Sequence, residues 1–540
     1  MKPRTQTLAV IAAALAIVSV RAWALLEATR YPFWTQGRLD NLVYERAARR
    51  MLEGDLTLGH EVLHMSPGYT AFLAVVFGLL GTGPWGWRLV QTALGLGAVL
   101  ATADAARTLA RRTWAFAVAL VMGFYGPLIF YEAQMLPEAL QTFLNASLLA
   151  LMARSMRAPV DEDSPRRWKR YALTGIVWGA SVLVRPNELL LAAPIAFGLA
   201  QTASAWRDRA KAVGVFALAG ALMIAPVTVR NRAVAGEWVM VTDSGGLNFF
   251  IGNGPGSLGV FRIPREVPGG TNADTQFPAF RAVAERDRGR SLTSREVDAY
   301  WFERTWRFIE RRPRRWALLL VEKTWLFWSA REVPNTEDYS FNRQLNGALA
   351  LPLVQYGTLA PFALVGTLLW LTRRRGAERV VAAINLTIMA ALVGFFVLAR
   401  YRIPAVPGLA LAAMGCVHAL VSWASKRSWP KLGVALVALA VTLPVVLTAK
   451  VPKPFDDEWF KLGVAWHYAN HLDEAADCYR RALAIEPKNV SARKNLAILL
   501  DSRGQFSAAE REWRLLLATA RERHLPDYER EALAHLPPGS

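Results

Sequence analysis

The fold of this chain is constrained most by a series of apolar runs, most of them about 15–22 residues long and bounded by Arg and Lys. A helix needs roughly 20 apolar residues to cross a bilayer. The chain has 540 residues, of which 53% are hydrophobic, so it is too long and too apolar for a single soluble core. The pattern therefore predicts an all-α polytopic membrane protein.

We expect about eleven membrane-spanning helices. The first apolar run covers residues 8–26 and follows Met-Lys-Pro-Arg, which is typical of an uncleaved signal anchor with a cytoplasmic N-terminus. The other expected spans are residues 88–106, 114–131, 138–153, 171–184, 189–205, 213–229, 351–371, 380–398, 403–421 and 432–447.

The distribution of charge sets the expected topology. Residues 66–80 are apolar but short of a full span, so we predict a helix that lies in the membrane interface and does not cross. With this choice the alternate loops on the cytoplasmic side are all basic, as the positive-inside rule requires. These loops are residues 107–112, 154–170, 206–211, 372–379 and 425–431.

This topology predicts a membrane domain over residues 1–450 and a separate C-terminal domain over residues 456–540. The first external loop, 27–66, the long external loop, 230–350, and the C-terminal domain are then periplasmic, in a bacterial inner membrane. The net charge of +20 lies largely in the cytoplasmic loops, so it does not indicate nucleic-acid binding. Within the long loop, residues 316–329 could dip into the membrane, although Glu322 and Lys323 argue against a plain span.

The sequence indicates no cofactor and no metal site. Cys416 and Cys478 form neither a disulfide framework nor a metal motif, and His60 and His64 have no zinc-site context. Residues 244–259 are Gly-rich but are not placed between a Rossmann strand and helix, so we expect turns there.

Carboxylates near the ends of spans are the candidate catalytic groups. Asp40 lies in the first external loop, where a carboxylate can accept the proton of a hydroxyl nucleophile, as glycosyl transfer requires. The alternative is an ordinary loop acid near a helix start. Glu132 and Glu138 lie in FYEAQMLPEALQTF at the outer end of a span. Here the alternative is that Pro137 and Glu138 simply open the next helix.

Arginines at outer span ends are the candidate phosphate ligands. Arg185 lies in LVRPNELL, and Arg400 and Arg402 lie in ARYRIPAVP. Arg binds phosphate through paired donors, and several such residues converging would make a lipid-phosphate site. The alternative is snorkelling of each arginine to the interface.

Residues 456–540 are charged, Ala-rich and helical in pattern, and they resemble tetratricopeptide repeats. Small and large positions recur about 34 residues apart. Gly463, Ala475 and Tyr479 are echoed by Ala497, Ala509 and Trp513, and Pro487 ends the first unit. Two units and a terminal helix are few for an independent array, so we expect packing on the membrane domain or on a protein partner.

The ordered motifs of residues 8–421 resemble the GT-C-fold glycosyltransferases of the protein O-mannosyltransferase and aminoarabinose-transferase superfamily. Asp40 and Tyr44 follow the first span, and SPGYTAFLAVVFGLLG resembles the family's proline-led segment. MLPEALQTF, LVRPNELLLAAP and YRIPAVPGLALAA resemble its second acidic motif, its Arg-Pro span end and its late Tyr-Arg-x-Pro motif. PVTVRNRAVAGEWVMVTDSGGLNFFIGNGP resembles its proline–arginine–asparagine and glycine–asparagine loop.

The resemblance implies transfer of a sugar from a polyprenyl-phosphate donor to a lipid, glycan or protein acceptor on the outer face of the membrane. It assigns the role of base to Asp40 and makes Glu138 a second acid of the site. The implied substrate-binding residues are Tyr44, Glu132, Arg185, Arg400, Tyr401 and Arg402. The chain departs from the family at Asn41, where a second acid is frequent, and near His64–Ser66, where some members carry an acid. Both departures weaken the case for a bound metal.

Two other classes of function compete with a glycosyltransferase. A transporter would favour charges inside the membrane and paired interrupted helices, whereas here the charges cluster at span ends. A non-catalytic scaffold would use the C-terminal repeats to recruit envelope proteins, and the Asp40 loop separates this alternative from an enzyme.

Overall fold

The computed structural model describes residues 3–35, 40–110, 112–157, 165–268, 273–335, 338–373, 376–448 and 456–537. Within these ranges the ordered elements are helices and no strand is present. The chain divides into two compact units. The first consists of Met1–Leu25, Gly37–Tyr339 and Asn346–Ala449, and the second of Leu26–Gln36, Ser340–Leu345 and Lys450–Ser540.

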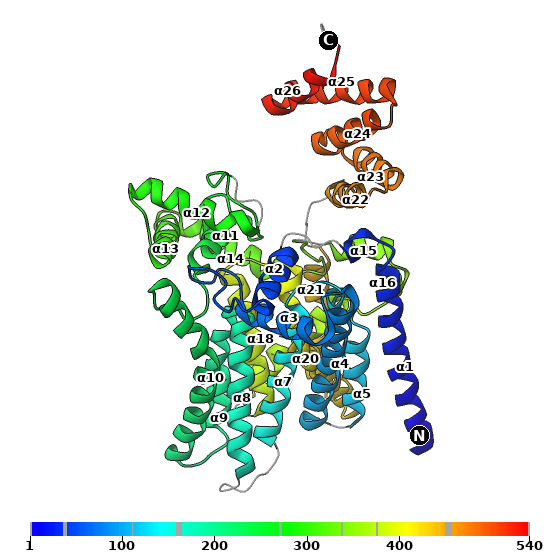
Figure 1. Ribbon diagram of the computed structural model, residues 1–540. Helices are drawn as coiled ribbons and strands as arrows, with labels where there is room; N and C mark the ends of the chain where they lie inside the picture. Colours follow the sequence, from blue (N-terminus) through cyan, green and yellow to red (C-terminus); the bar gives the residue numbers. More distant parts are fainter. Residues whose placement is uncertain are drawn as a thin grey trace. The chain divides into compact units, whose positions relative to one another are not determined.

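The first unit is a helical bundle (Figure 1). Its first helices are α1 (Pro3–Ala28), α2 (Asp40–Leu52), α3 (Pro67–Leu80), α4 (Pro84–Leu109), α5 (Arg112–Gly123), α6 (Gly126–Glu132), α7 (Glu138–Arg157), α8 (Pro165–Val184), η2 (Pro186–Leu191), α9 (Ala192–Ala200) and α10 (Trp206–Ala235). Then follow α11 (Gly245–Asn253), α12 (Ala273–Arg288), α13 (Ser294–Arg311), α14 (Pro313–Trp328), α16 (Gly347–Ala350), α17 (Tyr356–Leu371), α18 (Ala377–Gly394), α19 (Ala399–Arg402), η3 (Ile403–Ala405), α20 (Val406–Ser425) and α21 (Trp429–Leu447). Helix α15 (Tyr339–Leu345) belongs to the second unit except for its first residue.

Among the described residues, six helices are long and apolar enough to cross a membrane. They are Gln6–Ala28, Pro84–Leu109, Trp206–Ala235, Ala377–Gly394, Ala399–Ser425 and Trp429–Leu447. Shorter apolar helices cover Pro67–Leu80, Thr113–Gly123, Pro186–Ala200 and Tyr356–Leu371. The expectation of about eleven spans is therefore not established by length and composition, because several expected runs are interrupted. The run at 114–131, for example, is divided between α5 and α6.

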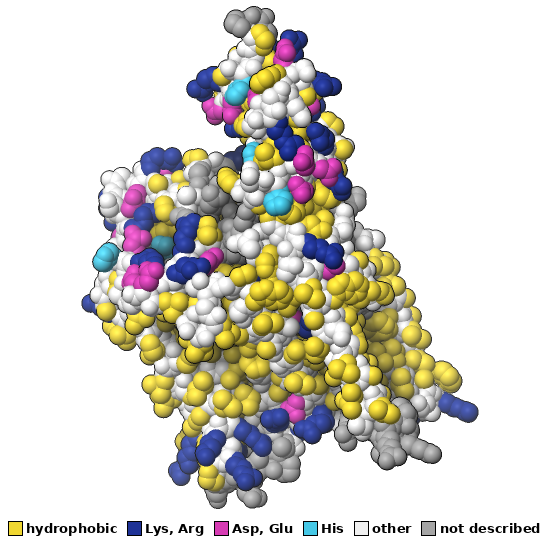
Figure 2. All heavy atoms as spheres, turned by 45° about the vertical axis from the view of Figure 1, so that its right-hand side comes forward, with side chains coloured by type: hydrophobic (Ala, Val, Ile, Leu, Met, Phe, Trp, Pro, Cys, Tyr) yellow, Lys and Arg dark blue, Asp and Glu magenta, His cyan; other side chains and the backbone are white. Residues whose placement is uncertain are grey.

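Close helix packing holds the bundle together. The pairs α8 with α10, α4 with α7 and α17 with α20 pack most extensively. Gly175 and Gly179 on α8 face α10, and a Cβ atom at Gly175 would lie 2.2 Å from the carbonyl oxygen of Phe216. Small residues four positions apart allow such close approach between helices in membranes. Figure 2 shows a broad band of hydrophobic side chains on this bundle and Lys and Arg side chains gathered at one end, as expected for a membrane protein.

The Gly-rich stretch at 244–259 differs in part from the prediction of turns, because Gly245–Asn253 forms helix α11 while residues 254–259 form turns and bends. Tertiary packing overrides the low helix propensity of glycine here. A Cβ atom at Gly246 would lie 2.1 Å from the Asp298 carbonyl oxygen, and one at Gly252 would lie 1.9 Å from the Phe395 carbonyl oxygen. The glycines therefore let α11 press against two neighbouring segments.

The second unit contains the C-terminal helices α22 (Asp456–Tyr468), α23 (Leu472–Ile485), α24 (Val490–Ser502), α25 (Phe506–Arg523) and α26 (Pro526–His535), together with η1 (Pro32–Trp34). The recurrent positions expected from the repeat are its core, since Ala475, Tyr479, Ala497, Ala509 and Trp513 are fully buried. A second apolar cluster joins Phe341 to Leu462 and Cys478, with Tyr31 and Trp459 packed against it.

Candidate active site

A cavity of about 210 Å³ lies in the first unit. Its walls contain Asp40, Tyr44, Ser66, Pro137, Glu138, Val184, Arg185, Pro186, Asn187, Thr242, Ser244, Gly245, Asn248, Leu392, Phe395, Phe396, Arg400 and Tyr401. We call this cavity the Asp40 pocket. It brings together six of the eight residues expected from the sequence to form the site.

Ends of helices present the charged groups of the Asp40 pocket. Asp40 begins α2, and Glu138 begins α7 directly after Pro137, where the positive end of the helix dipole favours a carboxylate. Arg185 follows the last residue of α8 and precedes Pro186, so it adopts an extended conformation between two helical segments. Arg400 lies on the short helix α19, which precedes the long apolar helix α20.

These four groups form one ion-pair network. Arg400 Nη1 lies 2.8 Å from Asp40 Oδ2, and Arg185 Nη2 lies 3.0 Å from Glu138 Oε1. Arg400 Nε lies 4.0 Å from the same Glu138 oxygen, so Arg400 is flanked by both carboxylates. Two acids and two guanidinium groups balance in charge, which reduces the cost of removing them from water.

The network leaves buried polar atoms unsatisfied. Among the described residues, neither Glu138 Oε2 nor Arg400 Nε has a hydrogen-bond partner, and the Glu138 side chain is 0% exposed. A buried polar atom without a partner costs about 1–3 kcal/mol, more when it is charged. A polar ligand in the Asp40 pocket would remove this cost by bonding to them.

Two tyrosines complete the charged side of the pocket. The guanidinium carbon of Arg185 lies 4.5 Å from the centre of the Tyr401 ring, a cation–π arrangement that fixes the arginine. Tyr44 packs edge-on against Tyr69, with 4.9 Å between ring centres. Burial raises the pKa of the Tyr44 hydroxyl and the charge of Asp40 raises it further, so Tyr44 stays protonated and remains a hydrogen-bond donor.

Glu132 and Arg402 were also expected from the sequence to bind substrate, but neither lines the Asp40 pocket. Glu132 is buried in the bundle, where its carboxylate accepts from Arg21 Nε at 2.9 Å. Arg402 is 0% exposed and donates to Glu332 Oε2 at 2.7 Å. Its Nη1 also donates to the Ser329 carbonyl at 2.7 Å. Both residues therefore join helices and loops of the fold and do not face the site.

Sequence reasoning missed the neutral polar side chains that line the pocket, which are Ser66, Asn187, Thr242, Ser244 and Asn248. The signal for Asn187 was its position two residues after Arg185 in LVRPNELL. The signal for Asn248 was its place in the stretch that resembles the glycine–asparagine loop, but this residue was not singled out because turns were expected there, and it lies on α11.

Helix α11 is fixed at both ends, so its pocket-facing side is held in place. At its start the Gly246 amide donates to Asp298 Oδ1. At its end Asn253 Nδ2 donates to the Gly394 carbonyl at 2.8 Å, and Asn253 Oδ1 accepts from Lys323 at 2.8 Å. Burial raises the pKa of Asp298 to about 6, while the Gly246 amide opposes this rise.

The described residues contain no cluster of three or more His, Cys, Asp or Glu side chains arranged to hold a metal ion. The Asp40 pocket contains a carboxylate that can act as a base, two guanidinium groups and neutral hydrogen-bonding side chains.

Comparison with known proteins gives a family match for part of the chain. Residues 456–489 match the tetratricopeptide repeat model. A search of curated proteins finds no match.

Solved structures similar to this chain include two membrane transferases. One is the oligosaccharyltransferase AglB from Archaeoglobus fulgidus in complex with an inhibitory peptide and a dolichol-phosphate. It has 14% sequence identity and a TM-score of 0.41, covering 85% of this chain and 59% of that chain. The other is ArnT from Cupriavidus metallidurans bound to undecaprenyl phosphate, with 16% identity, a TM-score of 0.36 and coverage of 77% and 79%. This chain thus spans little more than half the length of the archaeal protein.

Proposed function

We propose that this chain is a membrane glycosyltransferase that moves a sugar from a polyprenyl-phosphate donor to an acceptor hydroxyl on the outer face of a bacterial inner membrane. The proposal rests mainly on one observation: Asp40 and Arg400 are in direct contact within a cavity that also contains Glu138 and Arg185. The resemblance of the ordered motifs to GT-C-fold glycosyltransferases supports the same activity.

Each charged group has a role in the proposed reaction. The acceptor hydroxyl gives its proton to a carboxylate oxygen of Asp40, and its oxygen forms a bond to the anomeric carbon of the sugar. The bond from that carbon to the phosphate oxygen breaks, and the electron pair leaves with the polyprenyl phosphate. Arg400 and Arg185 stabilise the negative charge on the leaving phosphate.

The resting ion pair links donor binding to the base. Arg400 Nη1 lies 2.8 Å from Asp40 Oδ2, whereas Arg400 Nε has no hydrogen-bond partner among the described residues. A donor phosphate that takes up Arg400 weakens its hold on Asp40, because the guanidinium charge is then shared. Asp40 is then released to accept the proton of the acceptor hydroxyl. Glu138 keeps both arginines in place through its contacts at 3.0 and 4.0 Å.

A release assay with purified full-length protein tests this proposal. Undecaprenyl-phosphate-linked mannose, glucose, N-acetylglucosamine and aminoarabinose are supplied with membrane-lipid and peptide acceptors, and the release of undecaprenyl phosphate is followed. Asp40→Asn should lower turnover by about 100-fold or more, the usual effect of losing a general base. Glu45→Gln is the matched control, since Glu45 lies on the same helix and pairs with Arg49 at 2.7 Å outside the pocket.

The proposal fails if Asp40→Asn turns over at the rate of Glu45→Gln. It also fails if the wild-type protein neither binds nor consumes any of the donors. The second outcome would favour a scaffold.

The tetratricopeptide match favours an additional role in recruiting a protein partner. Repeats of this kind present extended surfaces to other proteins. In the proposed enzyme the repeat domain would bring an acceptor or an envelope protein to the outer face, and this role does not require that the repeats take part in the chemistry.

A further inference from the structure

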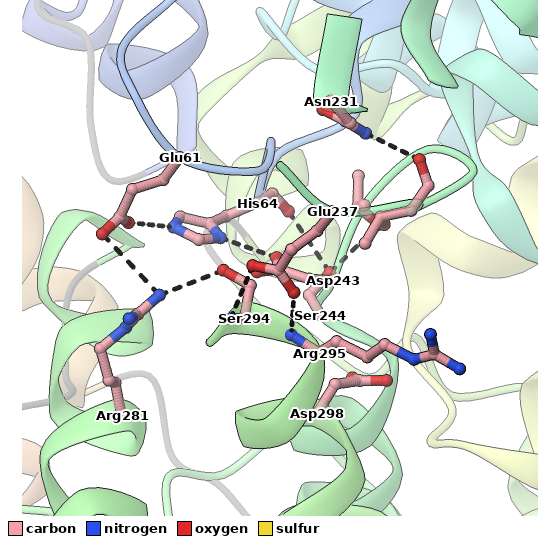
Figure 3. Close-up of polar contacts among 12 residues, drawn as sticks. Glu61, His64, Asn231, Glu237, Asp243, Ser244, Arg281, Ser294, Arg295 and Asp298 are labelled. Carbon is pink, nitrogen blue, oxygen red and sulfur yellow. Dashed lines mark hydrogen bonds and ion pairs between the residues drawn. The ribbon is translucent and has the colours of Figure 1, made fainter. Parts of the chain in front are cut away.

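We propose that His64 and Asp243 form a positioning pair that holds the hydroxyl-rich wall of the Asp40 pocket in place for binding the sugar. This inference rests on the proposed function, because it names the part of the same pocket that recognises the sugar. The wall contains Ser66, Thr242 and Ser244. Figure 3 shows the pair between the loop that precedes α3 and the segment that precedes α11.

Two hydrogen bonds in opposite directions join these segments. His64 Nδ1 lies 2.7 Å from Asp243 Oδ1, and Ser244 Oγ donates to the His64 carbonyl at 3.3 Å. Asp243 stands between two residues of the wall, and His64 stands two residues before Ser66. The imidazole therefore connects the two segments that carry Ser66 and Thr242–Ser244, and a displacement of the imidazole would move both segments.

The two partners are fixed by their surroundings. The Asp243 side chain is 1% exposed, and its Oδ2 has no hydrogen-bond partner among the described residues. A buried carboxylate depends strongly on its remaining partner. The imidazole stacks on the Phe277 ring at 3.5 Å between centres, and its Nε2 lies 3.3 Å from Glu61 Oε2.

The end of α10 also holds these two segments. Asn231 Nδ2 donates to the Val239 and Val241 carbonyls at 3.0 Å each, immediately before Thr242. Arg230 Nη1 donates to the Glu61 carbonyl at 2.6 Å, three residues before His64. Both segments are thus bonded to neighbouring residues of one helix, and the His64–Asp243 contact joins the two segments to each other.

The chemistry of the wall indicates its ligand. Ser66, Thr242, Ser244 and Asn248 offer neutral donors and acceptors, whereas the arginines of the pocket suit phosphate. A sugar ring presents several hydroxyl groups that need partners of the first kind. The wall therefore binds the sugar, and the positioning pair affects sugar recognition without affecting the phosphate.

The test compares substitutions that keep different nitrogens of His64. In His64→Asn the side-chain amide occupies the position of Nδ1 and can still donate to Asp243. In His64→Gln the amide reaches the position of Nε2 and keeps only the contact with Glu61. His64→Ala removes both. All variants are made in the full-length chain, and their thermal stability is measured first.

A cysteine reporter measures the position of the wall. Ser66→Cys lies on the wall, whereas the control Asn187→Cys lies on the arginine side of the pocket. The native Cys416 and Cys478 are buried. With His64→Ala and His64→Gln the rate of maleimide labelling at Ser66→Cys should change by about 10-fold, the scale of one charged hydrogen bond. With His64→Asn it should stay within about twofold, and Asn187→Cys should be unaffected throughout.

A binding assay tests recognition of the sugar. Undecaprenyl phosphate, which carries no sugar, should bind His64→Ala as it binds the wild-type protein. The KM for the sugar-linked donor should rise about 10-fold in His64→Ala and return close to the wild-type value in His64→Asn.

Equal labelling rates at Ser66→Cys in all three variants would overturn the proposal, as would equal effects of His64→Asn and His64→Gln. If the wild-type protein does not bind undecaprenyl phosphate, the proposed function fails. The labelling experiment still decides whether the pair positions the wall.

Discussion

Arg400 and Arg402 are two residues apart, and substitution of each by lysine should have opposite effects. Arg400 lines the Asp40 pocket and lies against both of its carboxylates, so we expect it to contact the donor phosphate. Arg402 lies outside the pocket walls and donates to the carbonyls of Ser329 and Arg331 and to Glu332. Arg400→Lys should therefore weaken donor binding, and Arg402→Lys should weaken the fold.

The size of each effect follows from the bonds involved. Lysine at position 400 keeps the charge beside Asp40 but loses the planar fork, so at least one charged hydrogen bond to phosphate disappears. Such a bond contributes about 1.5–3 kcal/mol, which corresponds to a rise in Kd of about 10- to 150-fold. Lysine at position 402 leaves one or more buried carbonyls without a donor, each costing about 1–3 kcal/mol of the free energy of unfolding.

The assay is a titration of the purified protein with undecaprenyl phosphate, read by native mass spectrometry, beside a thermal unfolding curve. Folded Arg402→Lys should bind with the wild-type Kd at a lowered Tm. Arg400→Lys should unfold near the wild-type Tm with weaker binding. Unchanged binding in Arg400→Lys, or the same loss of affinity in both variants, would refute this account of the pocket.

Three further predictions concern other parts of the chain. Burial raises the pKa of Asp298 from 3.8 to about 6, so the folded state binds the carboxyl proton more tightly than the unfolded state does. The contribution of this proton to the free energy of unfolding is complete below pH 3.8 and is lost as the pH rises through about 6. Between pH 4 and 6.5 the free energy of unfolding of the wild-type protein should therefore change by on the order of 2 kcal/mol more than that of Asp298→Asn. The same pH dependence in both proteins would contradict the raised pKa of Asp298. An alkaline phosphatase reporter fused after Lys450 should be active, as the basic loops predict, whereas activity of a cytoplasmic reporter at the same site would overturn the topology. Deletion of residues 456–540 should reduce transfer to a native envelope acceptor more than transfer to a small soluble analogue, and equal loss on both acceptors would indicate a role in stability alone.

The helical character of the chain could be predicted from its apolar runs, but the lengths of the helices could not. The run at 114–131 looks continuous in sequence, yet α5 ends at Gly123 and α6 begins at Gly126. The interruption coincides with a bridge between Tyr125 and Val354, and the Gly126 amide donates to the Val354 carbonyl at 3.0 Å. Contacts between residues so far apart in the chain leave no periodic pattern, so hydrophobicity alone misses the break.

The repeat domain was the most predictable part, because its contacts are local. The recurrent positions about 34 residues apart are the buried ones, including Tyr479 and Trp513.

The Asp40 pocket is the opposite case. Sequence pointed to Asp40 and Arg400 separately, but the contact between them joins segments from opposite ends of the membrane domain. Their roles stay predictions, while their proximity is a result of the fold.

Glu132 and Glu138 show most clearly why site residues could not all be chosen from sequence. Both are acids within one short motif, and both are buried. Glu132 ends α6, and both of its carboxylate oxygens accept hydrogen bonds from Arg21. Glu138 begins α7, and only its Oε1 is paired, while Oε2 is left without a partner among the described residues at the wall of a cavity. A satisfied pair in a packed interior stabilises the fold and has no group left to offer a substrate. An acid with an unsatisfied oxygen beside a cavity is stable only because neighbouring arginines balance its charge, and the same balance makes it ready to bind a polar ligand.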